Sequence, residues 1–133
     1  MVLALIVVAM TCAAVWRGYP HENPAIAPMA ALAAAQAGLK GPVFNDYDFG
    51  GYLIFRGVAP FVDGRVDLYG DDFMRAYSAA LNAEGDALPR LLDRYRVTWT
   101  LLPPGVPAAT ALDRLEGWER VYADASAVVH RRR

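Results

Sequence analysis

The first sixteen residues, Met1 to Trp16, carry no charged side chain, and this segment constrains the fold more than any other feature. As an α-helix it would be about 24 Å long at 1.5 Å per residue, whereas spanning a bilayer takes about 20 residues. Three structures fit it: the end of a transmembrane helix that begins before Met1, a secretory signal peptide, and a buried core helix. A signal peptide requires a basic region before its apolar residues, and this sequence shows none before them. Trp16 and Tyr19, by contrast, suit a membrane interface. We therefore expect a transmembrane helix, or its C-terminal part, over residues 1–17.

The composition of the remaining chain narrows the class of protein. Three prolines between Tyr19 and Pro28 predict a linker over 18–28, followed by one extracytoplasmic domain over 29–133. The formal net charge of −1 gives no basic surface for nucleic acid, so a nucleic-acid partner is not expected. Cys12 is the single cysteine, which excludes an internal disulfide.

Helical and extended patterns alternate along residues 29–133. Apolar side chains recur at helical spacing in 71–83 and 88–95, and β-forming residues fill 98–102 before two prolines. Further helices are expected at 29–39 and 107–115, and further strands at 42–45, 60–63, 118–122 and 127–130; residues 47–56 fit either a helix or a strand. This order predicts a small α/β sandwich with a mainly parallel sheet of about five short strands flanked by helices.

Aspartates and glycines gather between Asn45 and Asp72, in two segments that each follow a predicted strand. Because the carboxyl ends of neighbouring parallel strands meet at one edge of a sheet, both segments are expected to share a rim where ligands bind. The arginine fork of Arg65 suits a carboxylate or phosphate, with Asp67 holding it in place. The alternative is a structural ion-pair network of Asp63, Arg65 and Asp67. The predicted binding residues are Asn45, Asp46, Asp48, Asp63, Arg65, Asp67 and Tyr69.

No catalytic residue, metal site or cofactor is predicted. Asn45, Asp46 and Asp48 offer oxygen ligands for a hard cation, but the spacing of a calcium loop is missing. His21 and His130 are far apart, and the sequence contains no P-loop, dinucleotide-binding glycine motif or paired-cysteine motif. The chain is therefore not expected to catalyse a reaction by itself.

Six sequence motifs nevertheless occur in an order that resembles one known from other proteins. They are Tyr19-Pro20, the run from Gly41 to Ile54, the run from Phe61 to Gly70, Leu92 to Tyr95, Trp99 to Pro103, and Gly117 to Tyr122. Together they resemble the C-terminal domain of a group of bacterial multispanning membrane proteins. That group is similar to the membrane glycosyltransferases that use polyprenyl-phosphate sugars, which include protein mannosyltransferases and oligosaccharyltransferase catalytic subunits. The resemblance covers essentially everything after Arg17.

The resemblance implies a bacterial inner-membrane protein with its globular part outside the cytoplasm. In such enzymes the catalytic carboxylate lies between early transmembrane helices, and this sequence has no matching part. The implied function is a non-catalytic, membrane-anchored domain that positions an acceptor or a lipid-linked sugar donor. Its implied partners are the lipid bilayer, the remainder of a multispanning membrane protein, and a polyprenyl-phosphate sugar or acceptor. The alternative is a purely structural or interaction domain that packs on its parent membrane protein and binds no small ligand.

Overall fold

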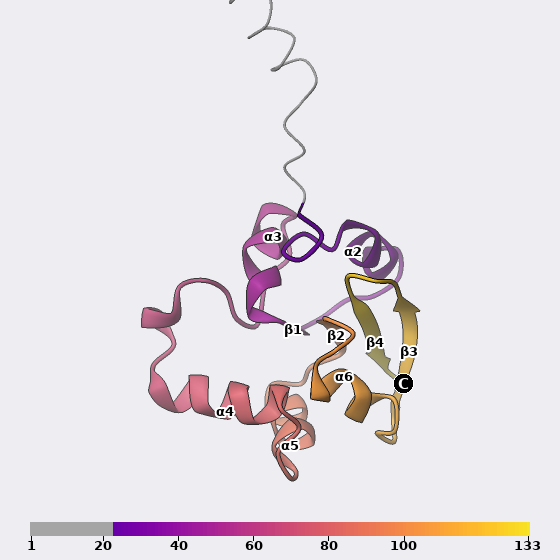
Figure 1. The fold of residues 1–133 in the computed structure, drawn as a ribbon. Helices are drawn as coiled ribbons and strands as arrows, with labels where there is room; N and C mark the ends of the chain where they lie inside the picture. The colour runs from indigo at the N-terminus through magenta and orange to yellow at the C-terminus, as the bar shows by residue number, and fades with distance from the viewer. Residues whose placement is uncertain (1–22) are drawn as a thin grey trace, which may run out of the picture.

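Residues 23–133 are described by a computed structural model and form a mixed α/β domain (Figure 1). The expected transmembrane helix over 1–17 lies outside the described residues. Within 23–133, no helix is both long and apolar enough to cross a membrane. The elements in chain order are α2 (Met29–Gln36), β1 (Val43–Asn45), 3-10 helix η1 (Tyr47–Phe49), α3 (Gly50–Phe55), 3-10 helix η2 (Val66–Leu68), α4 (Asp71–Leu81), α5 (Ala87–Arg94), β2 (Trp99–Leu102), α6 (Pro107–Leu112), β3 (Trp118–Ala123) and β4 (Val128–Arg132).

The described strands form one sheet in the order β1-β2-β4-β3. β1 and β2 are parallel, with Phe44 opposite Thr100, and the crossover between them contains α3, α4 and α5. β4 runs antiparallel to both β2 and β3, so the final hairpin inserts its second strand next to β2. All four residues of β2 are buried, as expected for a central strand covered on both faces.

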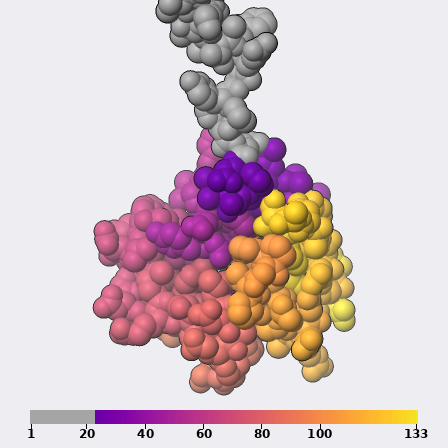
Figure 2. All heavy atoms as spheres, in the orientation of Figure 1, coloured from indigo at the N-terminus to yellow at the C-terminus, as the bar shows by residue number. Residues whose placement is uncertain are grey.

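The helices cover the two faces of this sheet in separate layers. One layer holds α2 and α3, whose Leu32 and Leu53 pack with Trp99 and Leu101 of β2. The other holds α4, α5 and α6, whose apolar residues pack with Phe44 and Leu102. Figure 1 shows α2 and α3 beside the start of the described chain, with α4 and α5 at the other end. The same separation is visible in the space-filling view of Figure 2.

The mainly parallel sheet of about five strands is wrong: four strands form and only one pair is parallel. The missing strand is the one expected at 60–63, which has no strand backbone. The Asn45 side chain instead satisfies the backbone of this segment. Phe61 N donates to Asn45 Oδ1, and Val62 O accepts from Asn45 Nδ2. A segment held in this way needs no neighbouring strand.

Helices form where the local signals predict them. α4 begins at two acidic residues, Asp71 and Asp72, whose charge favours a helix N-terminus. α6 begins at Pro107, which lacks the N–H that the first turn would leave without a partner. Residues 47–56, whose pattern fits either a helix or a strand, form η1 followed by α3.

The first turn of α3 depends on the absence of a side chain at Gly50. A Cβ atom at Gly50 would lie 2.5 Å from the Asp63 Cα, whereas a Cβ at Gly51 would meet nothing within 4 Å. Gly50 is therefore the point where the helix touches the segment that carries Val62 and Asp63.

This difference predicts opposite effects for two neighbouring substitutions. Gly50→Ala should lower the free energy of unfolding by about 1–3 kcal/mol, because the added methyl group overpacks the contact with Asp63. Gly51→Ala should leave stability unchanged or raise it by roughly 0.5–1 kcal/mol, because alanine suits a helix better than glycine. Urea unfolding followed by tryptophan fluorescence measures both. Equal effects of the two substitutions would contradict the close approach at Gly50.

Candidate functional site

Asn45, at the end of β1, is a predicted binding residue whose side chain is fully buried. Asn45 Nδ2 donates to the carbonyl oxygens of Val62, at 2.9 Å, and Asp46, at 2.7 Å. Asn45 Oδ1 accepts from Phe61 N at 2.7 Å. The amide therefore ties the 61–62 segment to the strand end, and both of its N–H groups are used inside the protein.

Asp46 and Tyr77 complete the polar contacts at this strand end. Asp46 Oδ1 accepts from Asp48 N at 3.0 Å and so caps η1, and burial raises the pKa of Asp46. The Tyr77 hydroxyl, which comes from α4, accepts from Tyr47 N at 2.9 Å and donates to Asn45 O at 3.3 Å. Burial also raises the pKa of Tyr77, so its hydroxyl stays protonated. Asp48 itself is exposed.

Asp63 is the acceptor at the centre of the second polar segment, and its side chain is 2% exposed. Arg65 Nε donates to Asp63 Oδ1 at 2.9 Å, and Arg65 Nη2 donates to Asp63 Oδ2 at 2.6 Å. The Tyr69 hydroxyl donates to the same Oδ2 at 3.0 Å. The guanidinium of Arg65, foremost among these partners, holds the pKa of Asp63 well below its usual range. The carboxylate is thus ionised and fully satisfied.

The remaining predicted residues lie at the surface. Asp67 is exposed on η2, and within the described part of the chain Arg65 pairs with Asp63 instead. The Arg65 side chain is 63% exposed, so the outer edge of its guanidinium faces solvent. In residues 23–133, no three His, Cys, Asp or Glu side chains gather closely enough to hold a metal ion. Asn45 bonds to the backbone at 61–62, and Gly50 lies against Asp63, so the two segments touch at these points. Their role in binding stays a prediction.

A run of aromatic rings connects these polar residues to the helices α4 and α5. Tyr69 stacks on Phe73 with ring centroids 5.1 Å apart, and Phe73 stacks on Phe61 at 5.3 Å. Tyr95 forms T-shaped contacts with Phe61 and Phe73, with ring centroids 4.9 Å and 6.1 Å apart. Hydrogen bonds at Asn45 and Asp63 therefore fix the backbone of Phe61 and the ring of Tyr69, the ends of a stack that supports Tyr95.

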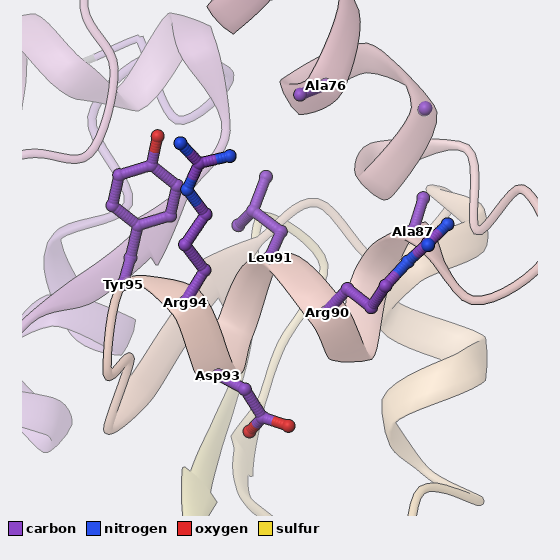
Figure 3. Close-up of a pocket in the computed structure, with 8 residues that line it drawn as sticks. Ala76, Ala87, Arg90, Leu91, Asp93, Arg94 and Tyr95 are labelled. Carbon is purple, nitrogen blue, oxygen red and sulfur yellow. The ribbon is translucent and has the colours of Figure 1, made fainter.

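Tyr95 forms one end of a groove of about 650 Å³ between α4 and α5 (Figure 3). This volume falls within the roughly 300–1,000 Å³ of typical ligand sites. Figure 3 shows Leu91 pointing from α5 toward α4, and Arg94 lying beside the Tyr95 ring. The groove is lined by Ala76, Ala79, Ala87, Arg90, Leu91, Asp93, Arg94 and Tyr95.

The charged side chains that line this groove are Arg90, Asp93 and Arg94. Arg94 lies over the Tyr95 ring, with its guanidinium carbon 5.6 Å from the ring centroid, and Arg90 pairs with the exposed Asp86 at 2.6 Å. Asp93 points away from α4 in Figure 3 and pairs with Arg132 of β4 at 2.8 Å. An apolar floor beside two guanidinium groups can hold an anion that carries an apolar part.

Sequence reasoning misses this groove, because it places the apolar residues on helix faces that pack in the core. The available signal is the combination of small residues on two consecutive helices with Arg90 and Arg94, which are four positions apart and so share a helix face. Neither helix alone shows that the alanines of α4 leave space above α5.

A second polar network, also missed, surrounds the fully buried His130 on β4. His130 Nε2 lies 2.8 Å from Asp113 Oδ1, and Thr100 Oγ1 lies 3.4 Å from His130 Nδ1. A neutral ring with its proton on Nε2 satisfies both contacts. Arg120 Nε donates to the same Asp113 oxygen at 2.8 Å. Thr100 and His130 are both 0% exposed, so these two side chains are closed to a substrate, whereas Asp113 and Arg120 reach the surface.

The Asp63–Arg65 pair predicts an order of effects among variants. Arg65→Gln should lower the urea midpoint more than Asp63→Asn, because it leaves a buried carboxylate without its cation, whereas an unpaired Arg65 can be hydrated. In the double variant the loss should be smaller than in Arg65→Gln alone. Urea unfolding of the three variants and the parent gives the coupling. Additive effects would show that the pair does not stabilise the fold.

His130 predicts a pH dependence of stability at mildly acidic pH. Burial, its largest influence, lowers the pKa of His130, while an unfolded imidazole titrates near about 6.5. Unfolding therefore takes up a proton between these two values, and stability present above about pH 6.5 is lost as the pH falls toward the folded pKa. His130→Gln should flatten the unfolding free energy between about pH 7 and pH 5. A flat parent profile would contradict the prediction.

Comparisons with models of known protein families, with curated proteins and with solved structures found no match. The resemblance to domains of membrane glycosyltransferase-like proteins therefore stays a prediction, and so do the expected partners and location. Function has to be inferred from the groove, the polar strand end and the apolar N-terminal sequence.

Proposed function

We propose that the chain is a non-catalytic, membrane-anchored domain of a glycosyltransferase-like membrane protein, and that it positions an acceptor or a lipid-linked sugar donor. The observation that carries this proposal is the groove between α4 and α5, where two arginines stand beside an apolar floor. Sugar phosphates and acidic acceptors offer the anionic oxygens that guanidinium groups bind. The ligand's apolar part would contact Leu91 and the alanines.

A binding role fits the described side chains better than a catalytic one. The carboxylate of Asp63 is neutralised by Arg65 and takes a third hydrogen bond from Tyr69, so it is a poor base. His130 and Thr100 are sealed inside the protein. Reactive groups for sugar transfer would then come from the parent membrane protein.

The predicted polar residues act in this proposal as the support of the groove. Asn45 fixes the backbone of Phe61, and the ring of Phe61 meets Tyr95 at the groove end. Asp63 fixes the hydroxyl of Tyr69, whose ring stacks on Phe73. Such supporting contacts hold a binding wall in one position before the ligand arrives, which reduces the ordering cost of binding.

The second candidate is a structural or interaction domain that packs on its parent and binds no small ligand. The internal saturation of Asn45, Asp46 and Asp63 favours it, because these polar groups are used to hold the fold. Under this alternative the groove between α4 and α5 would receive a segment of the parent protein.

Binding of a small amphipathic anion separates the two candidates. Purified full-length chain should bind geranyl phosphate in titration calorimetry, while geraniol and inorganic phosphate alone should bind more weakly. Arg94→Gln should weaken binding by about tenfold or more, since a charge-assisted hydrogen bond contributes about 1.5–3 kcal/mol. Ala79→Phe should block the groove.

The matched control is Arg75→Gln, an exposed α4 arginine that pairs with Asp72 outside the groove. It should bind like the parent, and circular dichroism should show that every variant is folded. If the parent does not bind geranyl phosphate, or if Arg75→Gln and Arg94→Gln weaken binding equally, the groove is not an anion site. The structural domain would then be the better proposal.

A further inference from the structure

The layer formed by α2 and α3 carries apolar side chains that the fold does not bury. Phe55, at the C-terminal end of α3, is 80% exposed, and the adjacent Ile54 is 48% exposed. Ile26, in the turn before α2, and Met29, the first residue of α2, are 48% and 43% exposed. Figure 1 shows α3 and the beginning of α2 at the same end of the molecule, where the described chain starts.

We propose that this surface, the apolar face of Ile26, Met29, Ile54 and Phe55, docks on the lipid interface of the membrane. The proposal rests on the proposed membrane anchoring through residues 1–16. Residues 17–22 are the six residues between that apolar sequence and Asn23, and they can span at most about 20 Å. The anchor would therefore hold Asn23, three residues before Ile26, within about 20 Å of the bilayer surface.

The groups around Phe55 have the chemistry of an interfacial anchor. Tyr52 lies one turn earlier, with its ring centroid 6.3 Å from that of Phe55. Arg56 Nη1 donates to the Tyr52 hydroxyl at 2.8 Å, and the guanidinium carbon lies 5.7 Å from the ring centroid. Aromatic rings and arginines are enriched at headgroup level, where one end of the side chain contacts hydrocarbon and the other contacts water.

The charge of the two segments that form this face also suits an anionic membrane. Residues 24–45 and 49–62 contain no Asp or Glu, while Lys40 and Arg56 are basic. The acidic residues of the polar loops begin at Asp46 and resume at Asp63, outside both segments. Anionic headgroups attract basic residues near the surface and would repel carboxylates.

A fluorescent reporter on the full chain tests this docking. Ala30 is exposed in α2 beside Met29, so a probe at Ala30→Cys leaves the apolar face intact; Cys12→Ser removes the native thiol. The protein is reconstituted in phosphatidylethanolamine–phosphatidylglycerol vesicles that contain lipids with a spin label near the headgroup. We expect quenching and a blue shift of an NBD probe at position 30, and loss of both in Ile54→Ser/Phe55→Ser. The same probe at Glu84→Cys, in the turn between α4 and α5, should stay unquenched.

NBD on the native Cys12 reports separately on the proposed anchoring. A quenched probe at position 12 with an unquenched probe at position 30 would overturn the docking and leave the anchoring intact. A blue shift at position 30 without lipid quenching would show a protein partner on the face and would also overturn it. An unquenched probe at position 12 would overturn the anchoring, and the docking with it.

Discussion

The buried amide of Asn45 is the interaction on which the arrangement of this domain depends. It lies where β1 ends and accepts a hydrogen bond from the backbone N–H of Phe61, sixteen residues later. Without it, residues 61–62 would have buried backbone groups with no partner, because no strand lies beside them. One side chain thus replaces a strand pairing and sets where the chain leaves the α3 layer and crosses to α4.

The influence of this contact reaches the other side of the sheet. The position of Phe61 is set by Asn45, and Phe61 packs against Phe44, Phe73 and Tyr95. The Tyr77 hydroxyl returns from α4 to the same strand end. The hydrogen bonds therefore fix the position of Phe61, and the contacts of its ring position Tyr95 at the wall of the groove between α4 and α5.

The sequence allowed the separate elements to be predicted better than their assembly. The periodicity of Leu88, Leu91 and Leu92 and the β-forming run at 99–102 are local patterns, and local patterns survive in the fold. The place of β4 between β2 and β3 depends on pairing across thirty residues, as between Thr100 and His130, and no local signal specifies it. Residues 60–63 look like a strand because they are apolar. Their backbone is instead hydrogen-bonded by the Asn45 side chain, a contact that the apolar pattern does not reveal. The rim expected at the ends of two neighbouring strands does not form as such, because the second strand is absent. The groove depends on the relative placement of two helices, which no local pattern specifies.

The separation of the two helical layers by the sheet gives the domain two chemically different sides. The apolar face and the groove belong to α2–α3 and α4–α5, which pack on opposite faces of β2. If lipid meets the first layer, the thickness of the sheet holds the arginine groove away from the hydrocarbon, open to the aqueous compartment. A ligand whose tail stays dissolved in the bilayer would have to leave it to reach Arg94, whereas a water-soluble acceptor arrives directly. Of the two proposed ligands, the two-sided architecture therefore favours the acceptor.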